Sequence, residues 1–331
     1  MKTMKTISLK HFTYQRYILV SLVLLSLLLL GCKEESIHFS TDDTGKIHIP
    51  VGIDGKTYNF AFDTGSSSTT INEKYKDSIA ERCRVIGKSE VWTWNKTLLR
   101  DQYSAINFNI GGFQYPTSFF LDSSKSIKAV NVLGMNVISQ YYWCFDFDEK
   151  VATISKSPMF IYGAKKLELK YLIVQGAIHV TIPIYGHSLD LLFDTGYRGV
   201  SDSSDAIAGT DITLFIDKDS LIAKKDSNNT DMLFQRNSGP GYLMIIKELA
   251  FDDYSLKYPF IQFIVPKDTS QKNKYKDKFD GIITSEFLRR YSRFCIDPVH
   301  KKLEFYDSKP TKEENVKKLY DQMCTITRAQ K

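Results

Sequence analysis

The chain has 331 residues, of which 43% are hydrophobic and 25% are charged, a composition typical of a globular protein of one or two domains. Its formal net charge of +6 overstates its basicity, because residues 1–31 carry four basic residues and no acidic one, which leaves 40 basic and 38 acidic residues. This near-neutral balance and the lack of any RNA- or DNA-binding motif argue against a nucleic-acid partner.

The N-terminus has the pattern of an export signal. A basic leader ends at Arg16, an apolar run follows from Tyr17 to Leu30, and Gly31-Cys32 comes next. The run is short for a membrane span but right for a signal-peptide core. Leu29 to Cys32 resembles a bacterial lipobox, in which the Cys is acylated. An ordinary signal peptide and an uncleaved N-terminal anchor are the alternatives.

We therefore expect residues 1–31 to be a signal peptide and residues 32–45, which are polar, to be a lipidated tether. The charged run Lys33-Glu34-Glu35 is similar to signals that send some Gram-negative lipoproteins to the cell surface. The sequence thus predicts an exported lipoprotein of the outer membrane, on its periplasmic or its cell-surface side.

Four further cysteines are Cys83, Cys144, Cys295 and Cys324. An exported compartment permits disulfides, and four cysteines allow three pairings. Cys144 and Cys295 lie in similar apolar strands, for which a buried free thiol is the simplest expectation. The sequence has no Cys-x-x-Cys pair and no His cluster, so we expect no metal and no cofactor.

The first domain is predicted to span residues 46–160 and to begin with a hairpin. Alternating apolar residues run from Ile47 to Ile53, Asp54-Gly55 makes a tight turn, and a second apolar strand runs to Phe62. Asp63-Thr64-Gly65-Ser66 follows directly. A carboxylate is therefore placed at the end of a buried strand, where a glycine allows the backbone to turn.

The same pattern recurs at a constant offset of 131 residues, in a second domain predicted for residues 161–308. The turn glycine Gly55 falls on Gly186, Phe62 on Phe193, and Asp63-Thr64-Gly65 on Asp194-Thr195-Gly196. Further on, Asp280 to Leu288 matches Asn131 to Ile138. A repeat of this length indicates an internal duplication.

The rest of the chain is mostly strand and hairpin, so the predicted fold is mainly β. The exception is the tail, residues 309–331, where the capping-box pattern Thr311-Lys312-Glu313-Glu314 predicts a helix to about Ala329.

Two similar units that each end a buried strand in a carboxylate are expected to bring Asp63 and Asp194 face to face. Two carboxylates in contact do not both ionise readily, so they share one proton. The ionised group can then activate a water molecule while the protonated group polarises a carbonyl. The alternative is that each Asp-Thr-Gly only ends a strand and the two never meet.

At this point the sequence resembles the pepsin and retropepsin-like aspartic peptidases, over most of residues 46–307. Phe62 to Ser67 matches the family's first active-site motif, Phe193 to Gly196 matches the second, and Val132-Leu133-Gly134 resembles its hydrophobic-hydrophobic-Gly element. The resemblance implies a bilobal acid-protease fold, with Thr64 and Thr195 exchanging hydrogen bonds between the lobes.

The same resemblance places a flap at one or both of two hairpins, near Trp92 and Trp94 and near Tyr242. These aromatic residues are equally compatible with core positions. Two departures from the family pattern are Tyr197, where a small residue is usual, and Thr284, where the family has a glycine.

The Tyr197 departure leads to a charge expectation. The hydroxyl of Ser66 is expected to hydrogen-bond the carboxylate of Asp63, which Tyr197 cannot do for Asp194. Asp63 should therefore hold more of the negative charge, and Asp194 more of the shared proton.

The sequence thus predicts a monomeric aspartic endopeptidase that acts on peptides or proteins, with Asp63 and Asp194 catalytic and Thr64, Gly65, Ser66, Thr195 and Gly196 in support. The membrane would be a partner only through the anchor at Cys32. A second hypothesis is an exported peptide-binding lipoprotein that has the same cleft and no catalytic activity.

Overall fold

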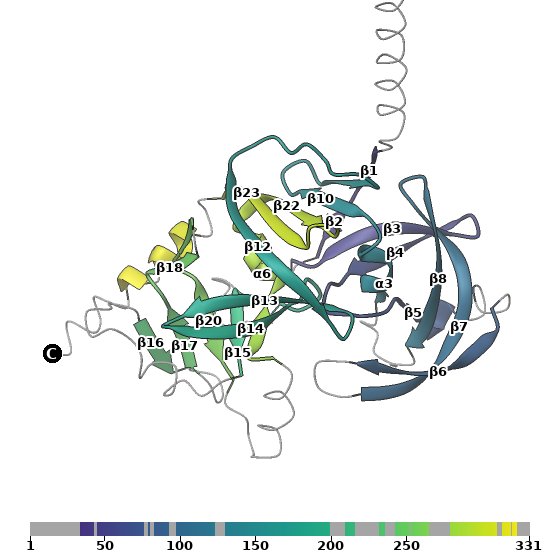
Figure 1. Cartoon of the computed structure of the whole chain (residues 1–331), viewed down its shortest axis with the longest axis horizontal. Helices are drawn as coiled ribbons and strands as arrows, with labels where there is room; N and C mark the ends of the chain where they lie inside the picture. Colours follow the sequence, from purple (N-terminus) through teal and green to yellow (C-terminus); the bar gives the residue numbers. More distant parts are fainter. Residues whose placement is uncertain are drawn as a thin grey trace, which may run out of the picture.

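The computed structural model describes residues 34–42, 45–75, 79, 83–92, 97–122, 130–198, 209–215, 232–235, 242–251, 253–264, 279–309, 313–318 and 320–322. In this part the chain is mainly β, as predicted, and strands from both halves of the sequence lie side by side (Figure 1).

The first repeat forms a sheet whose strands are ordered β2-β3-β4-β9-β5-β8-β7-β6. Their bounds are Ser40–Thr41 (β2), Ile47–Ile53 (β3), Lys56–Phe62 (β4), Thr70–Asn72 (β5), Val85–Trp92 (β6), Thr97–Ile110 (β7), Phe113–Asp122 (β8) and Asn131–Leu133 (β9). A further pairing, between Gly52 of β3 and Asn109 of β7, closes six strands of this sheet into a barrel. In sheet order they are β3, β4, β9, β5, β8 and β7.

The second repeat has the same strand order, β13-β14-β21-β15-β20-β17-β16, within a 13-stranded sheet. Their bounds are Ala177–Ile184 (β13), His187–Phe193 (β14), Ile212–Leu214 (β15), Met232–Gln235 (β16), Tyr242–Ile245 (β17), Phe260–Phe263 (β20) and Gly281–Ile283 (β21). A separate hairpin, β18 (Glu248–Phe251) with β19 (Tyr254–Lys257), precedes β20. The duplication read from the sequence is thus matched by strand topology.

The remaining six strands of the 13-stranded sheet join the two repeats, in the order β1-β11-β10-β22-β23-β12. Their bounds are Glu34–His38 (β1), Tyr142–Asp146 (β10), Val151–Ser155 (β11), Lys165–Val174 (β12), Tyr291–Asp297 (β22) and Lys302–Ser308 (β23). Each repeat supplies three strands, and the antiparallel pair β10–β22 lies at the centre. We call these six strands the joining sheet.

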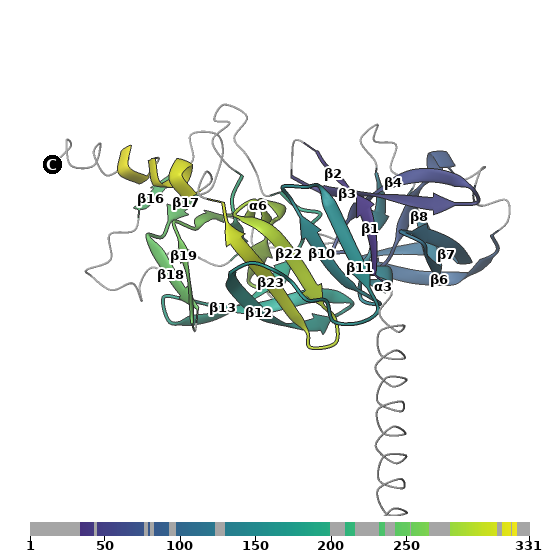
Figure 2. The ribbon, with the colours of Figure 1, turned by 90° about the horizontal axis from the view of Figure 1, so that it is seen from above.

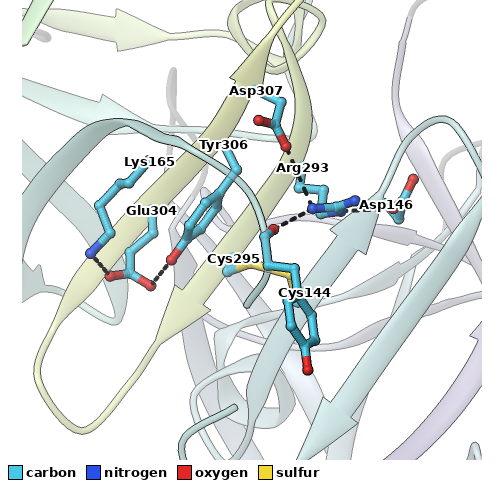
Figure 3. Close-up of a disulfide and its surroundings, with 9 residues drawn as sticks. Cys144, Asp146, Lys165, Arg293, Cys295, Glu304, Tyr306 and Asp307 are labelled. Atoms are coloured by element: carbon cyan, nitrogen blue, oxygen red, sulfur yellow. Dashed lines mark hydrogen bonds and ion pairs between the residues drawn. A yellow bond between two sulfur atoms is a disulfide. The ribbon is translucent and has the colours of Figure 1, made fainter. Parts of the chain in front are cut away.

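Two cysteines meet at that centre. Cys144 lies opposite Cys295 in the β10–β22 register, and the two form a disulfide with their Cα atoms 4.1 Å apart (Figure 3). The prediction of buried free thiols at these positions is therefore wrong. Each strand alone looks like an apolar core strand, and only the pairing of the two repeats brings the thiols together.

The prediction of a tether for residues 32–45 is also wrong in part, because a strand begins at Glu34. Residues Glu34 to His38 pair with β11 as the edge strand of the joining sheet, and Phe39 is buried against Phe145 and Phe147. The polar residues of β1 lie on an exposed edge, which is why their composition resembles that of a linker. Cys32 itself lies outside the described residues.

The core lies between the joining sheet and the strands that lead to the two predicted aspartates. Phe62 packs on Phe145 with ring centroids 4.8 Å apart, and Phe193 packs on Phe294 at 5.5 Å. The phenylalanine before each aspartate therefore rests on the joining sheet, which fixes the ends of both strands relative to each other.

The tail is helical at residues 313–318 and 320–322. Val316 and Tyr320 are buried against Ile245 and Phe260 of the second repeat, which accounts for the helix docking there. The rest of the predicted helix lies outside the described residues.

Candidate active site

Asp63 and Asp194 each follow a strand of a parallel pair. The amide of Asp63 donates to the carbonyl of Leu133 at 3.1 Å, and that of Asp194 to the carbonyl of Ile283 at 2.9 Å. These bonds continue the β4–β9 and β14–β21 ladders by one residue beyond each strand. Both carboxylates therefore start from a backbone position fixed by a buried sheet.

The structure brings the two carboxyl groups into direct contact, where they share a hydrogen bond. The loop backbones are packed just as closely. A Cβ atom at Gly65 would lie 2.6 Å from Oδ2 of Asp194, and one at Gly196 would lie 2.5 Å from Cγ of Asp63. Neither position has room for a side chain, so glycine is required at both by the opposite carboxyl group.

Thr64 and Thr195 join the two loops through four hydrogen bonds. The hydroxyl of Thr64 donates to the carbonyl of Phe193 at 2.6 Å and accepts from the amide of Thr195 at 3.2 Å. The hydroxyl of Thr195 donates to the carbonyl of Phe62 at 2.6 Å and accepts from the amide of Thr64 at 3.1 Å. Both threonines are buried. The exchange expected from the sequence is therefore present, and it fixes the distance between the two aspartates.

Each loop also holds its own carboxylate. The amide of Gly65 donates to Oδ1 of Asp63 at 2.9 Å, and the amide of Gly196 donates to Oδ1 of Asp194 at 2.8 Å. A hydrogen bond from an amide favours the charged form of a carboxyl group. The inner part of the site is thus symmetric in its residues and its bonds.

The site favours one shared proton. Burial raises the pKa of both carboxyl groups above the ordinary value of 3.8, and the charge of Asp63 raises the pKa of Asp194 further. The hydrogen bond from Asp194 and the amides of Gly65 and Ser66 lower the pKa of Asp63, against the effect of burial. The two carboxyl groups therefore share one proton, and the expectation that Asp63 holds more of the negative charge stays a prediction.

The role expected of the Ser66 hydroxyl is wrong. It donates to the carbonyl of Ser68 at 2.8 Å rather than to the carboxylate of Asp63, so its single proton is used within the turn. The backbone amide of Ser66, not its side chain, acts on Asp63. Tyr197 packs its ring against a small apolar cluster that includes Leu192 and Phe279.

The Thr284 departure has a local explanation. In the first repeat, a Cβ atom at Gly134 would lie 2.9 Å from the backbone nitrogen of Ser68 and closer still to its carbonyl group, so only glycine fits. In the second repeat, the side chain of Thr284 has room to donate to the carbonyl of Thr210 and to cap the short helix α6 (Ser285–Leu288) at the amide of Glu286.

A buried carboxylate behind the second loop was missed by the sequence reading. Glu286, whose side chain is 1% exposed, pairs with Arg198 at 3.1 Å and with Arg289 at 3.2 Å. Arg198 lies two residues after Gly196, so this ion pair ties the loop of Asp194 to α6. The equivalent residue of the first repeat is Asn136 in the helix α3 (Met135–Ile138), which accepts from the amide and hydroxyl of Thr69. Aligning the two helices by sequence would have drawn attention to this position.

The three candidate flap residues are less well defined. Trp92 is the last residue of β6, but its side chain and all of Trp94 lie outside the described residues. Tyr242 is the first residue of β17, and its half-buried ring packs against the main core. Which hairpin acts as a flap therefore stays a prediction.

Among the described residues, no group of three or more His, Cys, Asp or Glu side chains is placed to hold a metal ion. No helix in the same part of the chain is long and apolar enough to cross a membrane. The apolar run Tyr17–Leu30 and Cys32 lie outside it.

Comparison of the chain with protein-family models gives no match, and a comparison with curated proteins gives none either. The function must therefore be argued from the site itself.

Proposed function

We propose that this protein is an aspartic endopeptidase in which Asp63 and Asp194 form the catalytic dyad. The observation that carries the proposal is the contact between the two carboxyl groups, held by the reciprocal Thr64–Thr195 bonds. Holding two buried carboxyl groups in contact destabilises the folded protein and perturbs the pKa values of both groups. Perturbed pKa values of this kind are characteristic of catalytic sites.

We further propose the two-lobed fold of the pepsin and retropepsin-like peptidases. It is supported by the identical strand order of the two repeats and by a joining sheet to which each repeat contributes three strands. The closure of the first repeat into a barrel by the β3–β7 pair is a feature of this chain that the sequence reading did not include.

The mechanism follows from the protonation of the dyad. The ionised carboxylate of Asp63 removes a proton from a water molecule, whose oxygen attacks the peptide carbonyl carbon. The protonated Asp194 donates its proton to the carbonyl oxygen, which gives a neutral tetrahedral intermediate. The proton now on Asp63 passes to the leaving nitrogen as the C–N bond breaks, and a hydroxyl proton of the intermediate returns to Asp194. This sequence needs neither a metal nor a covalent intermediate.

The test is cleavage of a fluorogenic peptide library by the purified protein over a range of pH, with pepstatin as a probe of the dyad. We expect Asp63→Asn to reduce turnover by at least about 10³-fold, because water activation and carbonyl polarisation require both carboxyl groups. Asp101→Asn is the matched control, since Asp101 is an exposed residue of β7 that pairs with Lys88.

The same assay addresses the second hypothesis. Saturable binding of library peptides, with no cleavage at any pH, would contradict the peptidase proposal and support an exported peptide-binding protein. Cleavage that survives in Asp63→Asn would contradict the dyad while leaving a hydrolase of another kind.

We also propose that the protein is a monomeric, exported lipoprotein of the outer membrane, attached through Cys32. The signal-like run before Cys32 supports this, and so does the Cys144–Cys295 disulfide, because disulfides persist in oxidising compartments. Its partners are then peptide or protein substrates and the lipid bilayer.

A further inference from the structure

One end of the joining sheet carries an unusual surface. The strand registers place six residues across this end, from one edge of the sheet to the other: Glu34, Ser155, Tyr142, Asp297, Lys302 and Lys170. Figure 2 shows the start of β1, the turn between β22 and β23 and the end of β12 on the lower side of the molecule, while Figure 1 shows β1 and the end of β12 at opposite edges of the joining sheet. The end at which β1 begins is therefore shared by both repeats.

Four exposed apolar side chains gather there. Val299, at the tip of the β22–β23 turn, is 67% exposed. β12 continues past its last pairing with β23, at Lys170, and its final residues Leu172, Ile173 and Val174 are exposed as well. The amide of Tyr171 donates to the carbonyl of Lys301 at 2.9 Å, which holds the turn and the strand end together.

The clustering is not a general property of the surface. Of the ten large hydrophobic side chains that are exposed in the described part of the chain, these four lie at one end of one sheet. Two exposed lysines, Lys170 and Lys301, accompany them. We call these six residues (Lys170, Leu172, Ile173, Val174, Val299 and Lys301) the anchor rim.

The chain before Glu34 indicates what covers the anchor rim. Only Lys33 separates Glu34 from Cys32, and the apolar run Tyr17–Leu30 precedes Cys32. Two residues span at most about 7 Å. An acyl chain on Cys32 would begin within about 7 Å of Glu34, and an apolar run kept to Leu30 would end within about 14 Å of it. The membrane surface would therefore begin close to the β1 edge of the joining sheet, and a bilayer parallel to this end of the sheet would also reach the anchor rim at the β12 edge, five strand spacings or about 24 Å away.

We propose that the anchor rim rests on the lipid bilayer. Its apolar side chains would reach the upper acyl region at the boundary with the headgroups, and Lys170 and Lys301 would lie beside anionic headgroups, the arrangement found in interfacial segments. The N-terminal anchor supplies the affinity, so the role of the anchor rim is to fix the orientation of the protein. This inference depends on the proposed anchor and is independent of peptidase activity.

The orientation has a consequence for the site. The β12–β13 turn that follows Val174 packs on the loop after Asp63, where a Cβ atom at Gly176 would lie 2.7 Å from the Cβ atom of Ser67. The dyad would therefore be held one hairpin turn away from the bilayer, and substrates would meet it near the membrane surface.

The test uses the full-length, membrane-extracted protein reconstituted into vesicles of phosphatidylethanolamine and phosphatidylglycerol that carry brominated acyl chains. A tryptophan is introduced by Val299→Trp, and the matched control is Leu99→Trp in β7, since Leu99 is also 67% exposed. The three native tryptophans give the same background in both variants. We expect the brominated lipids to quench the Val299→Trp signal at least about twofold more than the Leu99→Trp signal, because only the first side chain would enter the acyl region.

Equal quenching of the two variants, or none in either, would overturn the proposal. Quenching by acrylamide in the aqueous phase distinguishes a bilayer contact from a protein contact at the anchor rim. If Val299→Trp is shielded from acrylamide but is not quenched by the brominated lipids, the anchor rim is covered by protein, either a second copy or another partner, and the bilayer contact is wrong.

Discussion

At the scale of single residues, the two repeats agree at the dyad and differ just behind it. The aspartates, threonines and glycines make the same bonds in both loops, whereas Gly134 is replaced by Thr284 and Asn136 by Glu286. The two carboxyl groups are thus placed by symmetric elements, while the packing behind them has diverged. Two predictions test these positions.

The first concerns the pH dependence of stability at Asp194. A carboxyl group whose folded-state pKa is raised adds stability below its ordinary value of 3.8, and that stability is lost as pH rises through the folded-state pKa. Asp194→Asn cannot ionise, so we expect it to be more stable than the wild type at pH 7, by about 1.4 kcal/mol for each unit of the pKa rise it removes.

The measurement is urea unfolding of both proteins at pH 3.5 and at pH 7. The gain at pH 7 should shrink toward zero at pH 3.5, where the wild-type group is protonated in the folded state and mostly protonated in the unfolded state. Asp101→Asn, at an exposed position, should change the free energy of unfolding by less than about 0.5 kcal/mol. A variant at Asp194 that is less stable than the wild type at pH 7 would contradict the burial argument.

The second concerns Gly134. We expect Gly134→Ala to lower the free energy of unfolding by about 1–3 kcal/mol, because the new Cβ atom meets the backbone of Ser68. Thr284→Gly, the reverse change at the equivalent position, should cost about 1 kcal/mol, since it removes a cap and a buried hydrogen bond. Urea midpoints give both values, and a Gly134→Ala midpoint equal to that of the wild type would refute the packing argument.

At the scale of elements, the site depends on the ends of β4 and β14. Packing on the joining sheet holds each strand end, and the hydrogen bonds of Thr64 and Thr195 hold the two ends to each other. Phe62 and Phe193 fix the strands on the joining sheet, and the carbonyls of the same two residues accept the threonine hydroxyls. Packing and hydrogen bonding thus act on the same residues, so a small loss at this junction should be felt in both stability and activity.

Thr64→Val tests the junction. It removes a hydroxyl that donates to one buried group and accepts from another, which leaves the carbonyl of Phe193 and the amide of Thr195 without that partner. Each unsatisfied buried group costs about 1–3 kcal/mol, so we expect a loss of about 2–6 kcal/mol in the free energy of unfolding.

Thr64→Ser is the control, because it keeps the hydroxyl and loses only a methyl group. Its loss should stay near 1 kcal/mol. Urea denaturation of the two variants decides the matter: equal losses would mean that the methyl group, rather than the hydrogen bonds, stabilises the junction.

At the scale of the whole molecule, the two repeats are joined by a continuous sheet and by one covalent bond at its centre. Cys144 and Cys295 are 151 residues apart in sequence, so their disulfide closes a long loop in the unfolded chain. In the joining sheet the ion pair of Arg293 with Asp146 also connects β22 with β10 (Figure 3). Separation of the repeats therefore requires the loss of several kinds of contact at once.

We expect the double variant Cys144→Ala, Cys295→Ala to lose about 2–5 kcal/mol of stability, because a long loop is no longer closed in the unfolded state. A reducing agent should lower the wild-type urea midpoint and leave that of the double variant unchanged. Cys83→Ala, at a free cysteine, is the control. A wild-type midpoint that is insensitive to full reduction would contradict this role of the disulfide.

The last prediction concerns membrane attachment. We expect Cys32→Ser to release most of the protein from the membrane fraction of the producing cell, because acyl chains would supply the greater part of the membrane affinity. Fractionation and intact mass measure this together. A variant that stays in the pellet and keeps residues 1–31 would show that the apolar run is an uncleaved anchor.

Much of the site could be predicted from the sequence, because the information is local and occurs twice. Apolar alternation, a tight turn and Asp-Thr-Gly recur at a fixed offset, and this alone indicated β strands that end in carboxylates. The mainly β class and the residues of the dyad follow from it. The glycines at 65 and 196 were expected because of a sharp turn, but neither has a positive φ, and the opposite carboxyl group is what excludes a side chain at each position.

The tertiary structure decided what depends on partners far away in the chain. The strand at Glu34–His38 has the composition of a tether and becomes ordered only by pairing with β11. The Cys144–Cys295 disulfide forms because β10 and β22 lie in register, and the Ser66 hydroxyl donates to the carbonyl of Ser68 instead of to the carboxylate of Asp63. A sequence pattern predicts which side of a strand is buried, but it does not predict which strand packs against that side. The packing of the two repeats determines this.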